Sequence, residues 1–367
     1  MKRIFFSSSW VIRLLFALLL GCATTLVAPA QEGRLVREKV HGKSLENTVT
    51  GEVADRSVSI YLPPSYDKLP AKRYPVVYLL HGIMDTDGTW ILEWSQKGDG
   101  WGTVPRLMDR ASAERRFGEM IVVMPDQKTK FGGSFYTNSK VTGNWEDFTV
   151  RDLVSYVDGK YRTIAKASSR GIAGHSMGGY GAITIGMKHP DVFSVVYGLN
   201  PAVLGWSRDL TIDNPGFANV LKVKTLEEAL QQGVYTFGII VVGQAFSPNA
   251  SRPPFFFDPP FVLVNGKLQP SEPAFRMWED HFPVKMVDTY GSNLTKLRGL
   301  RFDSGYEDEF LHIPPTARAL STELTARGIE HIFEEYNGDH RNRLWGRTGR
   351  LANEVFPYFW LLLDSEK

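Results

Sequence analysis

The amino-acid sequence predicts an α/β fold with a mostly parallel central sheet and helices on both of its faces. Short apolar runs recur along the chain, and amphipathic helix-like segments separate several of them. This alternation is typical of parallel sheets, whose two faces are both buried. One apolar run leads directly into a serine flanked by glycines. Because ligands of such sheets bind beyond the carboxyl ends of the strands, we expect a functional site there.

Seven segments have the apolar pattern of strands. They are RSVSIYLPPSY (56–66), YPVVYLLHG (74–82), MIVVMPD (120–126), RGIAGHS (170–176), VFSVVYGLN (192–200), LRGLRFDSG (297–305) and EHIFEEYNG (330–338). Helix-like segments lie at 145–161, 178–188, 315–327 and 342–363. Residues 201–289 break this rhythm because they are rich in proline and aromatic residues. We interpret them as a lid or insertion within a single domain of residues 31–367.

Residues 1–30 have the layout of a secretory signal peptide. Three basic residues accompany an apolar run that is too short for a membrane span of about 20 residues, and small residues follow it. Cleavage after Ala30 fits an A-x-A site. The alternative is a lipoprotein signal that ends at Cys22, which would be acylated and would bind the chain to a membrane. Either signal predicts a secreted or periplasmic protein.

The charge of the chain argues against nucleic-acid binding. The sequence has 42 basic and 40 acidic residues, and removal of residues 1–30 leaves 39 basic residues against 40 acidic ones. The remainder has no basic stripe with interleaved aromatic residues. Cleavage after Ala30 also removes the single cysteine, Cys22, so that disulfides and thiolate metal sites are excluded.

Ser176 is the candidate nucleophile. The pentapeptide GHSMG (174–178) matches the pattern G-x-S-x-G, between a predicted strand and a predicted helix. A serine on such a sharp turn is exposed above the sheet, and the following helix contributes a positive dipole near a forming oxyanion. The alternative is that Gly178 and Gly179 only permit close packing of the helix.

A serine hydroxyl needs a base, and His340 is the best candidate. In this architecture the order along the chain is serine, acid, histidine. His340 follows the last predicted strand, with a glycine-containing turn before it and a helix after it. His175 stands beside the serine and is expected to face elsewhere. The remaining histidines lie in the N-terminal lead-in, the loop after the 74–82 run, the insertion, or in or near predicted secondary structure: His41, His81, His189, His281, His312 and His331.

The base in turn needs a carboxylate that orients it. Two aspartates are candidates. Asp303 lies near the end of the apolar run at 297–305, and Asp308 follows this run. Asp303 is at the strand end, where aspartates also serve as turn formers. Asp308 lies deeper in the loop, from which its side chain can reach back to a histidine, and is the preferred candidate.

Acyl transfer also needs two backbone N–H donors for the oxyanion. Met177, the residue after the serine, supplies one. The other is expected from the loop that begins HGIMDTDGTW (81–90), where Ile83 is the best candidate. The alternative is that His81 and Gly82 simply form a turn.

Several segments together resemble the esterase D and feruloyl esterase-like family of α/β-hydrolases. They are YPVVYLLHG, GNWEDF, RGIAGHSMGGYGAI, HPDVFSVV, the GYED of residues 305–308, and YNGDH. The family includes S-formylglutathione hydrolases, feruloyl esterases, siderophore esterases and secreted mycolyltransferases. The resemblance covers residues 56–200 and 300–363, and it departs from compact members of the family in the long 201–289 segment.

This resemblance implies an α/β-hydrolase fold with Ser176 as nucleophile, His340 as base and Asp308 as orienting acid. It favours Asp308 over the alternative aspartate. The oxyanion donors that it implies are Ile83 and Met177. No metal or organic cofactor is required by this machinery.

We therefore expect an exported serine carboxylesterase that acts on small-molecule or polysaccharide-linked esters. Export argues against S-formylglutathione and favours esters such as hydroxycinnamoyl groups on plant polysaccharide. Aromatic side chains form either a wall for an aromatic acyl group or the insertion's own core: Trp90, Trp94, Phe255, Phe256, Phe257 and Phe261. The alternative functions are a mycolyltransferase-like acyltransferase, a siderophore esterase and a non-catalytic binding protein on the same fold.

Overall fold

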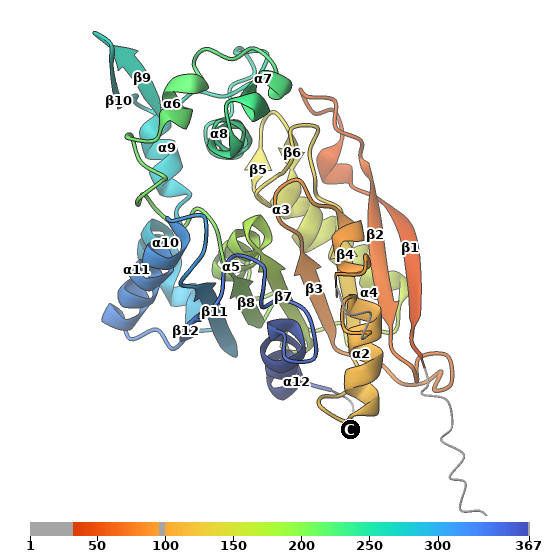
Figure 1. Cartoon of the computed structure of the whole chain (residues 1–367). Helices are drawn as coiled ribbons and strands as arrows, with labels where there is room; N and C mark the ends of the chain where they lie inside the picture. The colour runs from red at the N-terminus through yellow and green to blue at the C-terminus, as the bar shows by residue number, and fades with distance from the viewer. Residues whose placement is uncertain (1–31, 95–99, 366–367) are drawn as a thin grey trace, which may run out of the picture. The chain divides into compact units, whose positions relative to one another are not determined.

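The computed structural model describes residues 32–94 and 100–365, which belong to one contact unit. The predicted signal peptide, with Cys22 and Ala30, lies outside the described residues. Within them, an eight-stranded sheet has the order β1-β2-β4-β3-β7-β8-β11-β12 (Figure 1). Its strands are β1 (Arg34–His41), β2 (Asp55–Leu62), β3 (Val76–Leu80), β4 (Ile121–Pro125), β7 (Arg170–His175), β8 (Val195–Leu199), β11 (Gly299–Gly305) and β12 (Ile332–Tyr336). No described helix has the length and apolar character needed to cross a bilayer.

The sheet is parallel from β4 through β12, whereas β1 and β2 pair antiparallel at one edge. All seven segments with a strand-like pattern form these strands. Because parallel strands end at the same edge, the loops after β3, β7, β8, β11 and β12 meet there. These loops carry the candidate functional residues.

Successive side chains on a strand point to opposite faces, which gives the sheet two apolar cores. On β3, Tyr78 and Leu80 belong to one core, and Val77 and Leu79 belong to the other. The helices that contribute to the first core include α3 (Trp145–Asp147), α4 (Val154–Lys160), α5 (Met177–Lys188), α10 (Pro283–Leu294) and α11 (Ile313–Ala326). Two helices contribute to the second: α2 (Val104–Ala113) and α12 (Phe356–Leu362). The predicted coverage of both faces by helices is confirmed.

One predicted helix, at 342–363, is wrong over its first half. Residues 342–349 form turns and bends, and a short π-helical segment, Leu351–Val355, precedes α12. Gly346 has a positive φ of 96°. An α-helix does not accommodate this conformation, so the helix begins after it.

The segment between β8 and β11 adds an aromatic cluster to the first core. Trp206 lies in ring contact with Phe217, Phe261, Phe275, Trp278 and Phe282. Its elements are α6 (Pro215–Asn219), α7 (Leu226–Gln231), α8 (Val234–Phe246), the hairpin β9 (Phe261–Val264) and β10 (Lys267–Pro270), and α9 (Ala274–Asp280). The boundary that the sequence predicts at residue 289 falls inside α10, which packs on α5 as part of the sheet's own cover.

Two glycines let α5 begin directly against the sheet. A Cβ atom on Gly174, at the end of β7, would lie 2.3 Å from the carbonyl oxygen of Gly178. A Cβ on Gly178 would lie 2.2 Å from the carbonyl oxygen of Leu80 at the end of β3. Real Cβ atoms do not come this close to backbone, so only glycine allows the approach.

We expect Gly178→Ala to lower the free energy of unfolding by about 3 kcal/mol or more, because its methyl group meets backbone atoms that cannot rotate away. Gly159 in α4 is a matched control, since a Cβ there meets nothing within 4 Å. Gly159→Ala should raise the free energy of unfolding by up to about 1 kcal/mol, through helix propensity. Urea unfolding measures both values. Equal stabilities of the two variants would show that the elbow is not tightly packed.

Candidate active site

Ser176 stands on a strained turn between β7 and α5. Its backbone angles are φ 58° and ψ −117°, a conformation that costs free energy for any residue with a side chain. The backbone N–H of Ser176 donates to the carbonyl oxygen of Leu199, and its own carbonyl accepts from Tyr180 and Ala202. The turn is therefore fixed on both sides, and it presents the serine side chain at the carboxyl end of the sheet.

Two backbone N–H groups beside Ser176 are free to bind an oxyanion. Met177 is the first residue of α5, where an N–H has no partner within the helix. Within the described part of the chain, neither Met177 nor Ile83 donates its backbone N–H to another protein group. The loop that holds Ile83 is close to the serine, because a Cβ on Gly82 would lie 3.5 Å from Cβ of Ser176.

His81 orients the peptide unit that carries the Ile83 N–H. Its Nδ1 donates to the carbonyl oxygen of Gly82 at 2.8 Å, and its Nε2 accepts from the backbone N–H of Gln127 at 2.9 Å. In a trans peptide the carbonyl and the N–H point in opposite directions. The His81 ring holds the Gly82 oxygen and thereby turns the Ile83 N–H the other way.

His340 and Asp308 form a buried hydrogen-bonded pair. Nδ1 of His340 lies 2.7 Å from Oδ2 of Asp308, and the two residues are 1% and 3% exposed. The other carboxylate oxygen of Asp308 accepts from the backbone N–H of Phe310. A carboxylate that accepts at Nδ1 leaves Nε2 of the neutral ring free to take up a proton. The side chains of Ser176 and His340, both among the described residues, form no hydrogen bond with each other in this structure. Hydrogen bonds between catalytic groups often shorten only when substrate is bound.

The backbone of His340 is anchored next to the serine. Its carbonyl oxygen accepts from Nε2 of His175 at 2.7 Å and from Nδ2 of Asn200 at 3.0 Å. The rings of His175 and His340 are 4.5 Å apart between centroids. The expectation that His175 faces elsewhere is wrong, and sequence reasoning missed both positioning residues. The signal for His175 is its place directly before the serine, at the end of a central strand.

Asn200 links three of the loops at this edge of the sheet. In addition to His340, its side chain donates to the hydroxyl of Tyr336 and accepts from the backbone N–H of Gly305 at 2.7 Å. These contacts join the end of β8 to the ends of β11 and β12. The loops that carry Asp308 and His340 are therefore held in register.

Burial shifts the titration of these groups toward their neutral forms. It lowers the pKa of His175 to about 3, and it lowers the pKa of His340 and of His81 below the ordinary value. Burial also raises the pKa of Asp308. The His340 ring is consequently unprotonated at neutral pH, which is the state that a general base requires.

Asp303, the alternative acid, is occupied elsewhere. It is fully buried, and its carboxylate accepts from Arg350 at 2.7 Å and from the hydroxyl of Tyr197 at 2.8 Å. Burial raises its pKa, although the charge on Arg350 and these hydrogen bonds oppose the rise. This arrangement gives Asp303 a structural role beneath the sheet edge, away from His340.

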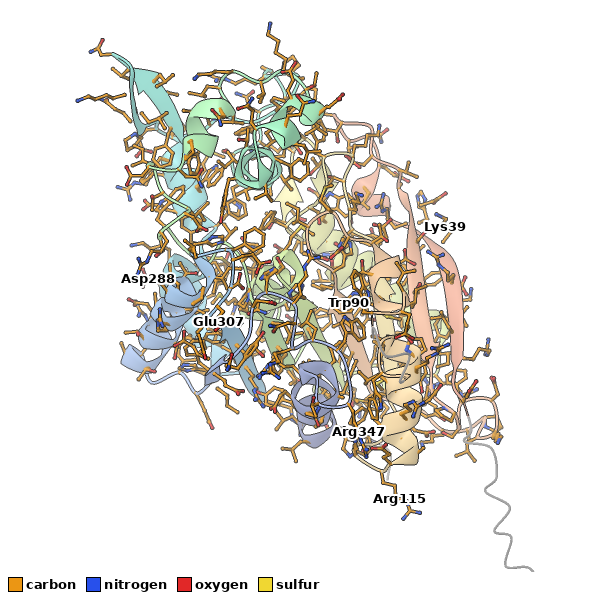
Figure 2. All side chains as sticks on the ribbon, in the orientation of Figure 1. Lys39, Trp90, Arg115, Asp288, Glu307 and Arg347 are labelled. Atoms are coloured by element: carbon orange, nitrogen blue, oxygen red, sulfur yellow. The ribbon has the colours of Figure 1, made fainter. Side chains whose placement is uncertain are left out.

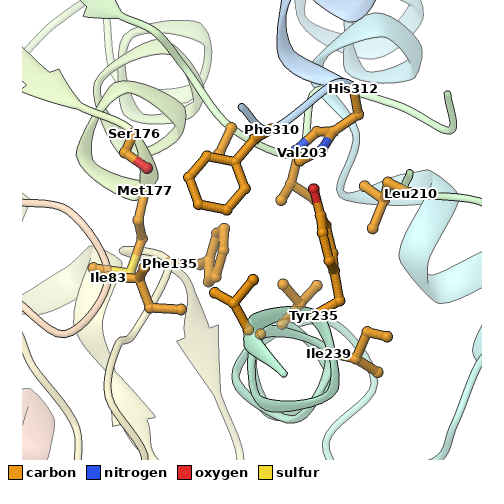
Figure 3. A pocket seen from close by; sticks show the side chains of 14 residues that line it. Ile83, Phe135, Ser176, Met177, Val203, Leu210, Tyr235, Ile239, Phe310 and His312 are labelled. Carbon is orange, nitrogen blue, oxygen red and sulfur yellow. The ribbon is translucent and has the colours of Figure 1, made fainter. Parts of the chain in front are cut away.

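A narrow apolar cavity of about 80 Å³ opens beside the serine (Figure 3). Ile83 and Met177 line it together with Ser176, and α8 covers it with Tyr235 and Ile239. Its shape and lining suit a small apolar group. In the described ranges, no three His, Cys, Asp or Glu side chains are grouped so that they would hold a metal ion.

The aromatic residues that the sequence offers as a substrate wall lie elsewhere, and none of them lines the cavity as described. Trp90, labelled in Figure 2, is 2% exposed and packs in the core on the α2 side of the sheet. Trp94 is exposed and donates to the Thr89 carbonyl. Phe255, Phe257 and Phe261 are buried in the core that includes the insertion, and Phe256 contacts Phe131. The burial of these rings favours the alternative interpretation, in which they form the insertion's own core.

We expect His340 and His175 to stay neutral until the pH falls well below about 6.5. His41 is an internal control, because hydrogen bonds from its exposed ring to Glu46 and Asp55 raise its pKa. NMR chemical shifts of the histidine rings, recorded over a pH series, measure the pKa values of His340, His175 and His41. Any activity that uses His340 as a base should then fall only as the pH drops through the lowered pKa of His340. Protonation of His340 before His41 would contradict this account.

Curated relatives match part of the chain, among them an esterase and a xylanase/feruloyl esterase. Esterase Rv1288 of Mycobacterium tuberculosis is 33% identical over 138 residues, which is 36% of this chain and 26% of that protein. An endo-1,4-beta-xylanase/feruloyl esterase of Xylanibacter ruminicola is 29% identical over 163 residues, which is 42% of this chain and 21% of that protein. The chain thus spans about a quarter or less of these relatives.

Solved structures match nearly the whole chain. A ferulic acid esterase has a TM-score of 0.60 at 20% identity, with 90% of this chain and 99% of that one covered. FphF, a fluorophosphonate-binding serine hydrolase of Staphylococcus aureus, has a TM-score of 0.55 at 17% identity, with 91% and 100% covered. These likenesses confirm the predicted α/β-hydrolase fold. The model of the family described as "Putative esterase" matches residues 53–349, and the chain therefore belongs to this esterase family.

Proposed function

We propose that this protein is an exported serine carboxylesterase that forms an acyl-enzyme on Ser176. The observation that carries the proposal is the buried Asp308–His340 hydrogen bond, whose histidine backbone is anchored to the residue before a strained serine. Two unpaired N–H groups stand beside that serine. Family membership supports the esterase activity, and the layout of residues 1–30 supports export.

In this mechanism His340 takes the proton from Oγ of Ser176 as Oγ attacks the ester carbonyl carbon. Charge then develops on the carbonyl oxygen, where the N–H groups of Ile83 and Met177 bind it. Asp308 stabilises the imidazolium form of His340 and keeps Nδ1 protonated. The imidazolium returns the proton to the leaving alcohol. Water, deprotonated by His340, then releases the acid from the serine.

The cavity supports a small acyl group as the preferred substrate. Its volume of about 80 Å³ is roughly half of the 150 Å³ that accommodates benzene in an engineered protein cavity. A hydroxycinnamoyl ester, such as the feruloyl ester that one relative's name suggests, needs the side chains on α8 to move aside. Short aliphatic esters enter without this movement.

We expect Ser176→Ala to abolish hydrolysis across a panel that runs from short p-nitrophenyl esters to methyl ferulate, because no other group supplies the nucleophile. In the wild type, kcat/KM should be highest for short acyl groups. A fluorophosphonate probe should label the wild type and not the variant, which tests the serine independently of the substrate.

Labelling without hydrolysis would redirect the assignment to acyl transfer, tested by adding carbohydrate acceptors. Equal inertness of the wild type and Ser176→Ala toward both the probe and the panel would refute a serine hydrolase.

Asp308→Asn and Asp303→Asn separate the two candidate acids. We expect Asp308→Asn to lower kcat by about 10,000-fold while the fold persists, because an amide stabilises neither the Nδ1–H tautomer nor the imidazolium. Asp303→Asn should instead cost about 3 kcal/mol of unfolding free energy, since it leaves the charge on Arg350 without its buried partner. Steady-state kinetics of both variants measure kcat, and urea unfolding measures their free energies of unfolding. The reverse pattern would assign the catalytic role to Asp303.

A further inference from the structure

His312 carries a buried ring nitrogen that has no partner. Its side chain lines the cavity beside Ser176, and its Nε2 is one of the buried polar atoms, among the described residues, that form no hydrogen bond. The residue is only 4% exposed. Buried polar atoms in folded proteins nearly always have a partner. An orphan acceptor in the wall of an active-site cavity therefore points to a ligand group.

Asp209 fixes the His312 ring in one orientation. Its Oδ1 accepts from the backbone N–H of His312 at 2.8 Å and from Nδ1 at 2.9 Å. Its Oδ2 accepts from the N–H of Leu311 and the hydroxyl of Tyr235. Burial alone would raise the pKa of Asp209, but the hydrogen bonds from His312 and Tyr235 outweigh it and lower that pKa. The charged carboxylate only accepts, so Nδ1 carries the proton and Nε2 of the neutral ring presents a lone pair.

A water molecule is a poor partner for this nitrogen. A buried water needs two to four polar neighbours. Apart from Ser176 and His312, the side chains that line the cavity are apolar except for Tyr235, whose hydroxyl already donates to Asp209 (Figure 3). The geometry favours a ligand that is mostly apolar and carries one hydrogen-bonding group.

The cavity lies on the acyl side of the scissile bond. The leaving alcohol must be next to His340, which returns its proton, yet His340 is not among the residues that line the cavity as described. Ser176, Ile83 and Met177 do line the cavity. Phe310 contacts both histidines, with ring centroids 4.9 Å from His340 and 6.5 Å from His312. Since His312 lines the cavity and His340 does not, His312 is on the acyl side.

We propose that Nε2 of His312 binds a hydroxyl group on the acyl chain of the substrate, which makes this enzyme selective for esters of hydroxy acids. The inference rests on the proposed esterase function. A hydroxyl group donates to the neutral ring and accepts from the protonated ring, so it suits both states of His312. A hydroxyalkanoyl chain and a hydroxyaryl group both offer this chemistry.

Matched pairs of esters that differ only in the hydroxyl group test the proposal. The aliphatic pairs are ethyl 3-hydroxybutyrate with ethyl butyrate and ethyl 6-hydroxyhexanoate with ethyl hexanoate. The aryl pair is methyl 4-hydroxycinnamate with methyl cinnamate. In at least one pair we expect kcat/KM of the wild type to be about tenfold higher for the hydroxylated ester. The pair that shows it identifies the source of the hydroxyl.

His312→Leu should abolish that preference, so that the two members of the pair have similar kcat/KM values. Asp209 keeps Tyr235 and two backbone N–H donors in this variant, so we expect it to fold. His312→Gln should retain part of the preference, because its amide both donates and accepts. If His312→Leu does not fold, a preference that is undiminished in a folded His312→Gln decides against hydroxyl binding by His312.

Three results would overturn the proposal: no preference in any pair, a preference that survives in His312→Leu, or an equal fall for both members of a pair at unchanged thermal stability. The esters without a hydroxyl separate this failure from failure of the esterase assignment. If they are hydrolysed in a Ser176-dependent way, the esterase stands and only the hydroxyl site falls. If none of the esters is hydrolysed, both fall.

Discussion

The active site depends on the close approach of α5 to the ends of β3 and β7. Gly174 and Gly178 leave no room for a Cβ atom at this contact, and the turn between them forces Ser176 into a positive φ. The strain persists because hydrogen bonds from both sides of the serine over-determine its backbone. The same approach brings the loop with Ile83 against the serine. One packing constraint thus positions the candidate nucleophile and both oxyanion donors.

The segment between β8 and β11 closes the site from the opposite side. Its aromatic residues pack around Trp206, so they stabilise the insertion and do not form the cavity wall. With that core in place, the apolar helix α8 lies over the cavity beside Ser176. Asp209 then ties this segment to the start of α11 through Leu311 and His312. The insertion shapes the cavity beside Ser176 and also fixes a polar residue, His312, in its wall.

The sequence predicts the strands and the pairing of Asp308 with His340 because both depend on local patterns. The strands follow from apolar runs, and the two residues follow from their positions in the loops after these runs. It missed β1, whose burial pattern is mostly exposed and whose charged residues hide the strand period. The aromatic residues offered as a substrate wall do not line the cavity beside Ser176, and a proline-rich stretch does not reveal which rings it buries. His312 was passed over because its role depends on Asp209, which lies 103 residues away in the chain. Contacts of that range have no local signature.

Three histidines at this edge of the sheet share one arrangement, and they differ in what Nε2 meets. In His81, His340 and His312, Nδ1 lies beside an oxygen that only accepts: the Gly82 carbonyl, Asp308 and Asp209. When such a ring is neutral, its Nε2 presents a lone pair. His81 uses it to accept a backbone N–H, and His340 uses it, in the proposed mechanism, to take the serine proton. Of these three, His312 presents Nε2 to an apolar cavity, where the atom has no hydrogen-bond partner among the described residues, and in our proposal a hydroxyl group of the acyl chain binds it.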